Sequence, residues 1–158
     1  MRMHSFIYFR TRWLMSLLLL LWCGFSAAQN SAVLKFRQGE PFKIVQFTDV
    51  HLDNTQPNCA ETASVIKHVL AAEKPDLIIL TGDIVTYSPA AEGWNAIAAI
   101  MSESGIPWAV TLGNHDDEPG LSRSEIFDLL EPKKGFIAQK GPEEISGTGN
   151  YILEIKAS

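Results

Sequence analysis

The chain has 158 residues, with 18 acidic and 13 basic side chains and a formal net charge of −5. This acidic balance argues against non-specific nucleic-acid binding, which needs a basic face, and we expect no nucleic-acid partner. Of the two cysteines, only Cys59 lies outside the first 28 residues, so we expect no intrachain disulfide in the mature protein.

Residues 1–28 have the pattern of a secretory signal peptide. Three arginines and no acidic residue precede an apolar stretch, Trp13–Phe25, which is followed by the small residues 26–28. The stretch is about 13 residues long, shorter than the roughly 20 that cross a bilayer, and a retained membrane anchor is the alternative. We therefore expect export to the periplasm or the extracellular space, with membrane contact only through this segment during export.

Residues 29–158 are long enough for one small domain, and their pattern alternates between strands and helices. In chain order it predicts an edge strand at 34–37 with a turn at 38–41, a strand at 43–48, a helix at 61–73, a strand at 77–80, a helix around 94–101, a strand at 108–112, a helix that begins at 122, and a strand at 150–155. A glycine- and lysine-rich stretch, 133–149, is expected to be a flexible loop.

Apolar spacing and end signals support these elements. The first two helices place apolar side chains on one face, at Val65, Ile66, Val69 and Leu70 in one and at Trp94, Ile97, Ala98 and Met101 in the other. Ser122 and Glu125 have the spacing of a capping box at the start of the third helix. The continuous apolar run 77–80 is typical of a strand buried on both faces of a parallel sheet. The order of elements predicts an α/β fold with a βαβαβ core.

Polar clusters follow three of the predicted strands directly. They are Asp49-Val50-His51, Gly82-Asp83 and Gly113-Asn114-His115-Asp116. The intervals between them are each roughly 30 residues, the length of one βαβ unit. Because parallel strands end at one edge of the sheet, we expect the clusters to gather there, where open α/β proteins bind ligands.

The residue types in these clusters suit metal ions. Asp49 and His51 are two residues apart, and an extended backbone would direct both to the same side. A carboxylate and an imidazole suit first-row ions, and Asp83 could bridge two ions about 4 Å apart. Asn114 offers a neutral carbonyl oxygen to the second ion. Taken singly, the first two clusters could be an ordinary surface loop and a turn.

His115 is interpreted as a proton donor, oriented by the carboxylate of Asp116. A capping or turn role for Asn114 and Asp116 is the alternative. All three clusters in order, at this spacing and after apolar strands, favour a metal-dependent site over these separate structural roles.

At these motifs the chain resembles the calcineurin-like metallophosphoesterases, whose series is Asp-x-His, Gly-Asp, Gly-Asn-His-Asp/Glu, a lone His and Gly-His-x-His. The resemblance implies that Asp49 and His51 hold a first metal ion, that Asp83 bridges two ions and that Asn114 binds the second. It also implies that His115 and Asp116 assist phosphate binding and leaving-group protonation.

The resemblance also implies the family's fold, a sandwich of mixed sheets flanked by helices. Residues 147–153 look like the exported branch related to purple acid phosphatases. No histidine follows His115, so the last two motifs are absent, and we expect a truncated chain that holds the N-terminal half of the domain. Thr86 stands where true purple acid phosphatases have a metal-binding tyrosine, so we expect His51 to supply that ligand and no iron–tyrosinate colour.

Three functions are compatible with these features. The first is a hydrolase of small-molecule phosphate esters with two divalent or trivalent ions, iron, zinc or manganese. The second is an inactive remnant that binds metal or a partner without turnover. The third, a structural α/β domain with incidental polar loops, would bind no metal.

Overall fold

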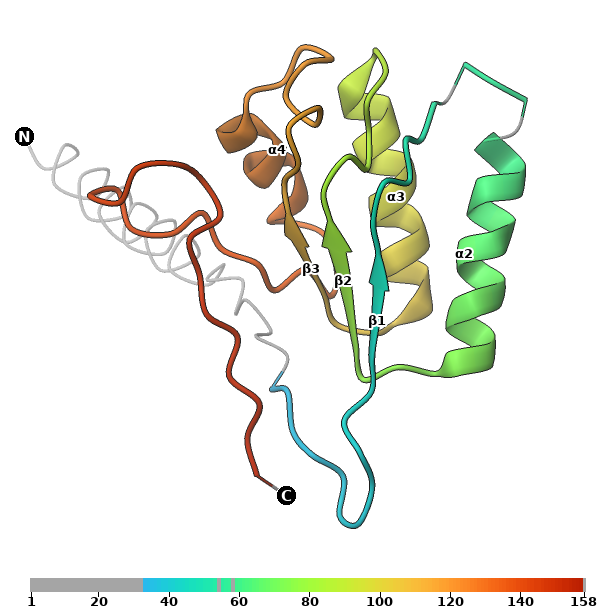
Figure 1. Ribbon diagram of the computed structural model, residues 1–158, viewed down its shortest axis with the longest axis vertical. Coiled ribbons are helices and arrows are strands. Elements are labelled where there is room, and N and C mark those ends of the chain that lie inside the picture. Colours follow the sequence, from blue (N-terminus) through green and yellow to red (C-terminus); the bar gives the residue numbers. More distant parts are fainter. Residues whose placement is uncertain (1–32, 54, 58, 158) are drawn as a thin grey trace, which may run out of the picture. The chain divides into compact units, whose positions relative to one another are not determined.

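The fold is built on three parallel strands that are hydrogen-bonded in the order β1-β2-β3 (Figure 1). The strands are β1 (Ile44–Phe47), β2 (Leu77–Thr81) and β3 (Trp108–Thr111), and the helices are α2 (Cys59–Glu73), α3 (Ala90–Ser104) and α4 (Arg123–Leu130). This computed structural model describes residues 33–53, 55–57 and 59–157. The predicted signal peptide, 1–28, lies outside them.

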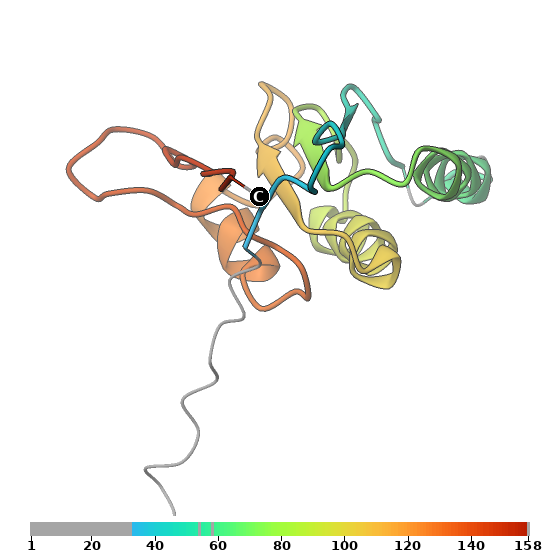
Figure 2. The ribbon, with the colours of Figure 1, turned by 90° about the horizontal axis from the view of Figure 1, so that it is seen from below.

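The α/β class and the βαβαβ order are confirmed. The helices α2 and α3 each connect two neighbouring parallel strands, and right-handed crossovers in one direction put both connecting helices on one face of the sheet. The end-on view in Figure 2 shows α2 and α3 on the same side of the strands, and α4 packs against α3. Within the described residues the sheet is parallel throughout, so it contains none of the antiparallel pairing of the expected mixed sheets.

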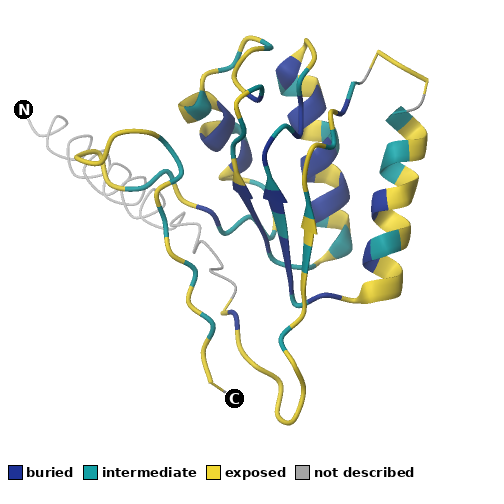
Figure 3. Ribbon diagram, in the orientation of Figure 1, coloured by how far each residue is buried: buried dark blue, intermediate teal, exposed yellow. Residues whose placement is uncertain are grey.

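The core lies between the sheet and α3. Ile78 and Leu80 of the central strand are 0% exposed, as are Trp94, Ile97 and Met101 of α3, which confirms the predicted face of that helix. Figure 3 shows this concentration of buried residues on the sheet side of α3. α2 buries only a narrow stripe at Ile66 and Leu70, because it covers the edge strand β1. Val65 was expected on the buried face and is instead 61% exposed.

The ends of the helices follow the predicted signals. The Ser122 side chain accepts from the Glu125 backbone N–H, and a Glu125 carboxylate oxygen accepts from the Ser122 N–H at 2.8 Å, a complete capping box. α3 ends at Gly105, whose φ of 71° is in the left-handed region that glycine adopts without strain. Among the described residues, no helix has the length and apolar content to span a membrane.

The two outer segments differ from prediction. Residues 34–37 and 150–155 were expected to be strands, but they contribute only an isolated bridge, Lys35 to Lys156. In the second segment Tyr151 and Leu153 pack against the core without a ladder, and Ile152, on the opposite side, is 90% exposed. Conversely, part of the expected loop 133–149 pairs with β3, since the Ile137 N–H donates to the Trp108 carbonyl at 2.9 Å.

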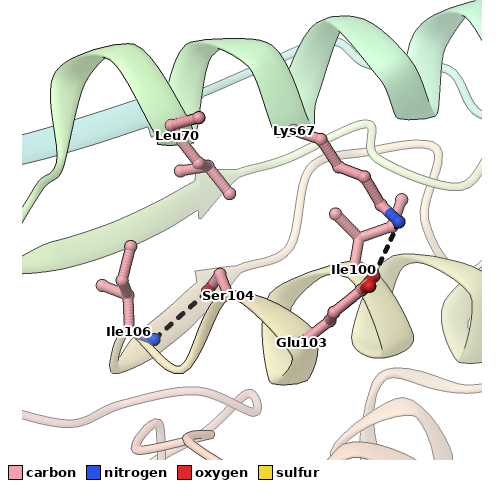
Figure 4. A pocket seen from close by; sticks show the side chains of 7 residues that line it. Lys67, Leu70, Ile100, Glu103, Ser104 and Ile106 are labelled. Atoms are coloured by element: carbon pink, nitrogen blue, oxygen red, sulfur yellow. Dashed lines mark hydrogen bonds and ion pairs between the residues drawn. The ribbon is translucent and has the colours of Figure 1, made fainter.

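A small pocket lies between α2 and α3 (Figure 4). It has a volume of about 260 Å³ and apolar walls that include Leu70 and Ile100, and the ion pair Lys67–Glu103, at 2.6 Å, lines one side. The last turn of α3 and the loop into β3 form part of it, so it opens near the amino ends of the strands. The predicted ligands follow the carboxyl ends, so this pocket is separate from them.

The buried carboxylate of Asp116 joins the loops that follow β2 and β3. Asp116 is 0% exposed and is the only buried charged residue in the described part of the chain. One of its oxygens accepts from the N–H groups of Asp83 and Gly113, at 2.9 and 2.7 Å, and the other accepts from those of Ile84 and Val85, at 2.8 and 3.1 Å. Four backbone donors in the interior thereby obtain their acceptor.

We expect Asp116→Asn to destabilise the fold by roughly 2–5 kcal/mol, because the amide nitrogen would face backbone donors that then lack an acceptor. Urea denaturation of both proteins measures the loss. The matched control is Asp117→Asn, which affects a surface ion pair to Arg123 at 3.2 Å and should cost no more than about 1 kcal/mol. Equal losses for the two variants would contradict the assigned role of Asp116.

Candidate metal centre

Three predicted metal ligands lie together at the carboxyl edge of the sheet. Asp49 and His51 follow β1, and Asp83 follows β2; each offers one ligand atom, and these atoms lie within 4.8 Å of one another. Asp49 and His51 are exposed and Asp83 is partly buried. The βαβ spacing therefore brought together side chains that are far apart in the sequence.

The backbone at all three residues is left-handed. The φ angles of Asp49, His51 and Asp83 are 50°, 46° and 51°, and Lys74 is the only other described non-glycine residue with a positive φ. The extended backbone expected at Asp49 and His51 is therefore wrong, because β1 ends before them, at Phe47. Left-handed backbone is uncommon outside glycine, although Asp and His adopt it more readily than most residues, and it often occurs at functional sites.

Hydrogen bonds between the loops hold this backbone in place. The Asp49 N–H donates to the Gly82 carbonyl, and the His51 N–H donates to the Asp83 carbonyl, each at 3.0 Å. The loops after β2 and β3 also touch directly, because a Cβ added to Gly82 would lie 2.7 Å from the Gly113 Cα. Both glycines are thus required by close approach of the two loops.

Asn114 lies exposed in the turn after β3. The next residue, His115, donates its backbone N–H to one carboxylate oxygen of Asp83 at 3.0 Å, which anchors this turn beside the ligand cluster. Asn114 is thus at the same edge of the sheet as Asp49, His51 and Asp83. Its role as a ligand of a second ion stays a prediction.

The imidazole of His115 is paired with Glu118, not with Asp116. Its Nδ1 lies 2.8 Å from a Glu118 oxygen, and this hydrogen bond, together with the negative charge of Glu118, raises the pKa of His115. Asp83 and Asp116 add smaller contributions to the raised pKa. Asp116 does not orient the ring, because both of its oxygens are occupied by backbone donors. The sequence analysis did not assign Glu118 to the site. The signal that could have identified it is an acidic residue three positions after His115 in a turn.

Two threonine hydroxyls contact the ligands, and the sequence analysis assigned neither of these roles. The Thr48 hydroxyl donates to an Asp49 carboxylate oxygen at 2.6 Å. The Thr86 hydroxyl oxygen lies 3.2 Å from Nδ1 of His51. Neither contact can be found from spacing, since it depends on how the loops after β1 and β2 turn.

The donor set fits a first-row metal ion. Two carboxylates and one imidazole converge on a small volume, and oxygen with imidazole nitrogen suits iron, zinc and manganese. Ligand oxygens on separate, mutually hydrogen-bonded loops give a site whose geometry exists before an ion binds.

Several known proteins are similar in sequence to this chain. Arabidopsis thaliana "Probable inactive purple acid phosphatase 14" is 34% identical over 146 residues, covering 78% of this chain and 36% of that protein. Saccharomyces cerevisiae "Phosphatase DCR2" is 29% identical over 136 residues, covering 72% of this chain and 23% of that protein. The chain thus spans about a third or less of the length of these relatives.

A solved structure, the Pseudomonas putida nuclease MPE, covers 65% of this chain and 51% of its own, with 15% identity and a TM-score of 0.42. The family model described as calcineurin-like phosphoesterase matches residues 42–154, which include every strand, every helix and every candidate ligand described above. The chain therefore belongs to the calcineurin-like phosphoesterases, a family that acts on phosphate esters with divalent metal ions.

Proposed function

We propose that the full-length protein hydrolyses small-molecule phosphate esters at a dinuclear metal centre. The observation that best supports this is the convergence of Asp49, His51 and Asp83 within 4.8 Å at the carboxyl edge of the parallel sheet. Family membership supports the reaction class. The acidic balance of the chain favours a small ester over a nucleic-acid polymer.

In this proposal Asp49 and His51 would hold the first ion and Asn114 the second. Asp83 would be a ligand of both. One Asp83 oxygen accepts from the His115 N–H, which fixes the orientation of this carboxylate. When bound, ions of iron, zinc or manganese supply positive charge for the phosphate and make a nucleophile available at neutral pH. The hydrogen bonds of the chain's own residues would hold these ligands in orientation.

His115 is proposed to donate a hydrogen bond or a proton to the phosphate ester. Its pKa is raised by Glu118, so the protonated imidazole persists to higher pH than in an isolated histidine. The ring centroid lies 6.4 Å from that of His51, so His115 faces the same edge of the sheet as the ligand cluster. Asp116, expected to share the catalytic role, is proposed to act only by fixing the loops.

A second candidate is a metal-binding protein without turnover. The Arabidopsis relative is named a probable inactive phosphatase, which favours this second candidate. Metal content and turnover, measured together, separate the two candidates.

We expect Asp83→Asn in the full-length protein to lower both metal content and hydrolysis of p-nitrophenyl phosphate, because the shared ligand loses its charge. His115→Ala should keep the metal and lower turnover by roughly 10²–10⁴-fold, since a positioned acid is lost. The loss for His115→Ala should be smaller with nitrophenyl than with alkyl leaving groups. Metal analysis and rates with both esters measure these effects.

The matched control is Asp128→Asn. Asp128 lies on α4, outside the metal-site loops, and pairs with Lys140, so this variant should leave metal content and rate unchanged. Bound metal without turnover in the unmodified protein would support the second candidate. A protein that binds no metal would exclude both. Loss of metal in His115→Ala would make His115 a ligand instead of a proton donor.

We also propose export with removal of residues 1–28, on the strength of their charge and apolar pattern. N-terminal sequencing of protein recovered outside the cytoplasm should begin at Gln29 or within a residue or two of it. An exported protein that still begins at Met1 would contradict cleavage and favour the retained anchor.

A further inference from the structure

We propose that Thr86 is a positioning residue for His51: its hydroxyl oxygen accepts a hydrogen bond from the Nδ1–H and so leaves Nε2 as the metal-binding nitrogen. This inference rests on the proposed metal centre. The Thr86 hydroxyl oxygen lies 3.2 Å from Nδ1, while Nε2 lies on the side of Asp49, 3.9 Å from its carboxylate oxygen. The two nitrogens of one ring therefore face different partners.

The chemistry of imidazole gives these contacts their meaning. A neutral histidine carries one ring proton, and the nitrogen that binds a metal must be the one without it. If Nε2 binds the ion, the proton is on Nδ1 and needs an acceptor. The Thr86 hydroxyl is that acceptor, so binding through Nε2 leaves no unpaired donor on the ring. The Thr48 hydroxyl likewise positions a ligand, because it donates a hydrogen bond to the Asp49 carboxylate.

The backbone holds His51 beside this acceptor. The His51 N–H donates to the Asp83 carbonyl at 3.0 Å, and the next N–H, of Leu52, donates to the Ile84 carbonyl at 2.8 Å. Leu52 is 2% exposed, so it fixes the chain on the other side of His51. The ring therefore extends from a backbone that is bonded to the loop carrying Thr86.

Buried contacts of the preceding residue fix the backbone at Thr86. Val85 is 0% exposed, and its N–H donates to the Asp116 carboxylate. Its side chain packs so closely on α3 that a Cβ added to Gly93 would lie 2.5 Å from a Val85 methyl group. The backbone that carries Thr86 is thus fixed by core packing and by Asp116.

Thr86→Val tests the hydroxyl alone, because valine keeps the shape and β-branching of threonine. In the full-length protein we expect the affinity for Zn²⁺ to fall by roughly 10–100-fold, the usual cost of losing an outer hydrogen bond to a ligand. Thr86→Ser keeps the hydroxyl and should bind close to the unmodified protein. Competition with a chelator of known affinity measures the binding.

A second measurement follows the proton itself. In the Zn²⁺-loaded protein, the Nδ1–H proton of His51 should give a slowly exchanging NMR resonance in the unmodified protein and in Thr86→Ser. In Thr86→Val the same resonance should be broadened or lost through exchange with water. Thr148→Val, in the loop 142–149 outside the site, is the control for threonine-to-valine replacement, and thermal melting confirms that each variant folds.

The outcomes separate this inference from the proposed function. If the unmodified protein binds Zn²⁺ and Asp49→Ala abolishes binding, but Thr86→Val binds as tightly as the unmodified protein, the role of Thr86 is wrong and the metal centre stands. Equal weakening in Thr86→Ser and Thr86→Val would also overturn it, because packing and not the hydroxyl would then matter. If the unmodified protein binds none of Zn²⁺, Mn²⁺ and Fe²⁺, the metal centre and this inference are both wrong.

Discussion

The carboxylate of Asp116 lies in the interior with four backbone N–H groups directed at it, from the loops that follow β2 and β3. A buried carboxylate is costly unless it is fully hydrogen-bonded, and these donors are costly without an acceptor, so the two needs are met together. The N–H of Asp83 is one of the four, and the loop that carries Thr86 is fixed through two others. The position of the candidate metal centre therefore depends on a residue that is not among its ligands.

The loops at the carboxyl edge of the sheet are in close contact with one another. Glycines at 82 and 113 let two of them approach until a single added carbon atom would clash, and left-handed backbone at Asp49, His51 and Asp83 directs the ligands to one point. Such backbone costs roughly 1–3 kcal/mol per residue where it is strained, and the hydrogen bonds between the loops offset part of that cost. A site assembled in this way requires little reorganisation when an ion binds.

The two histidines of the site have different partners, and the difference agrees with different roles. His115 faces the carboxylate of Glu118, which favours its protonated form and suits a donor to phosphate. His51 faces a neutral hydroxyl, which can accept a hydrogen bond from Nδ1–H without adding charge and suits a metal ligand. A carboxylate beside His115 and a hydroxyl beside His51 agree with the proposed roles of proton donor and metal ligand.

The sequence by itself determined the alternation of strands and helices, because apolar periodicity, the capping box at Ser122 and the stop at Gly105 are local signals. It also placed Asp49, His51, Asp83 and the Gly-Asn-His-Asp cluster at one edge, since parallel strands joined by helices of similar length must end together. It could not decide which carboxylate serves which histidine. Asp116 is adjacent to His115 in the chain, yet it turns inward to the backbone, and Glu118 reaches the ring instead.

Only the tertiary structure decided the outer segments and the hydroxyl contacts. The alternating patterns at 34–37 and 150–155 are compatible with strands, yet in the fold these segments contribute only an isolated bridge, Lys35 to Lys156. Thr86 is 35 residues from His51 in the sequence, and their contact arises only because backbone bonds draw the loop after β1 onto the loop after β2. Spacing within one segment predicts which side chains share a face, whereas contacts between loops depend on backbone turns that the whole fold imposes.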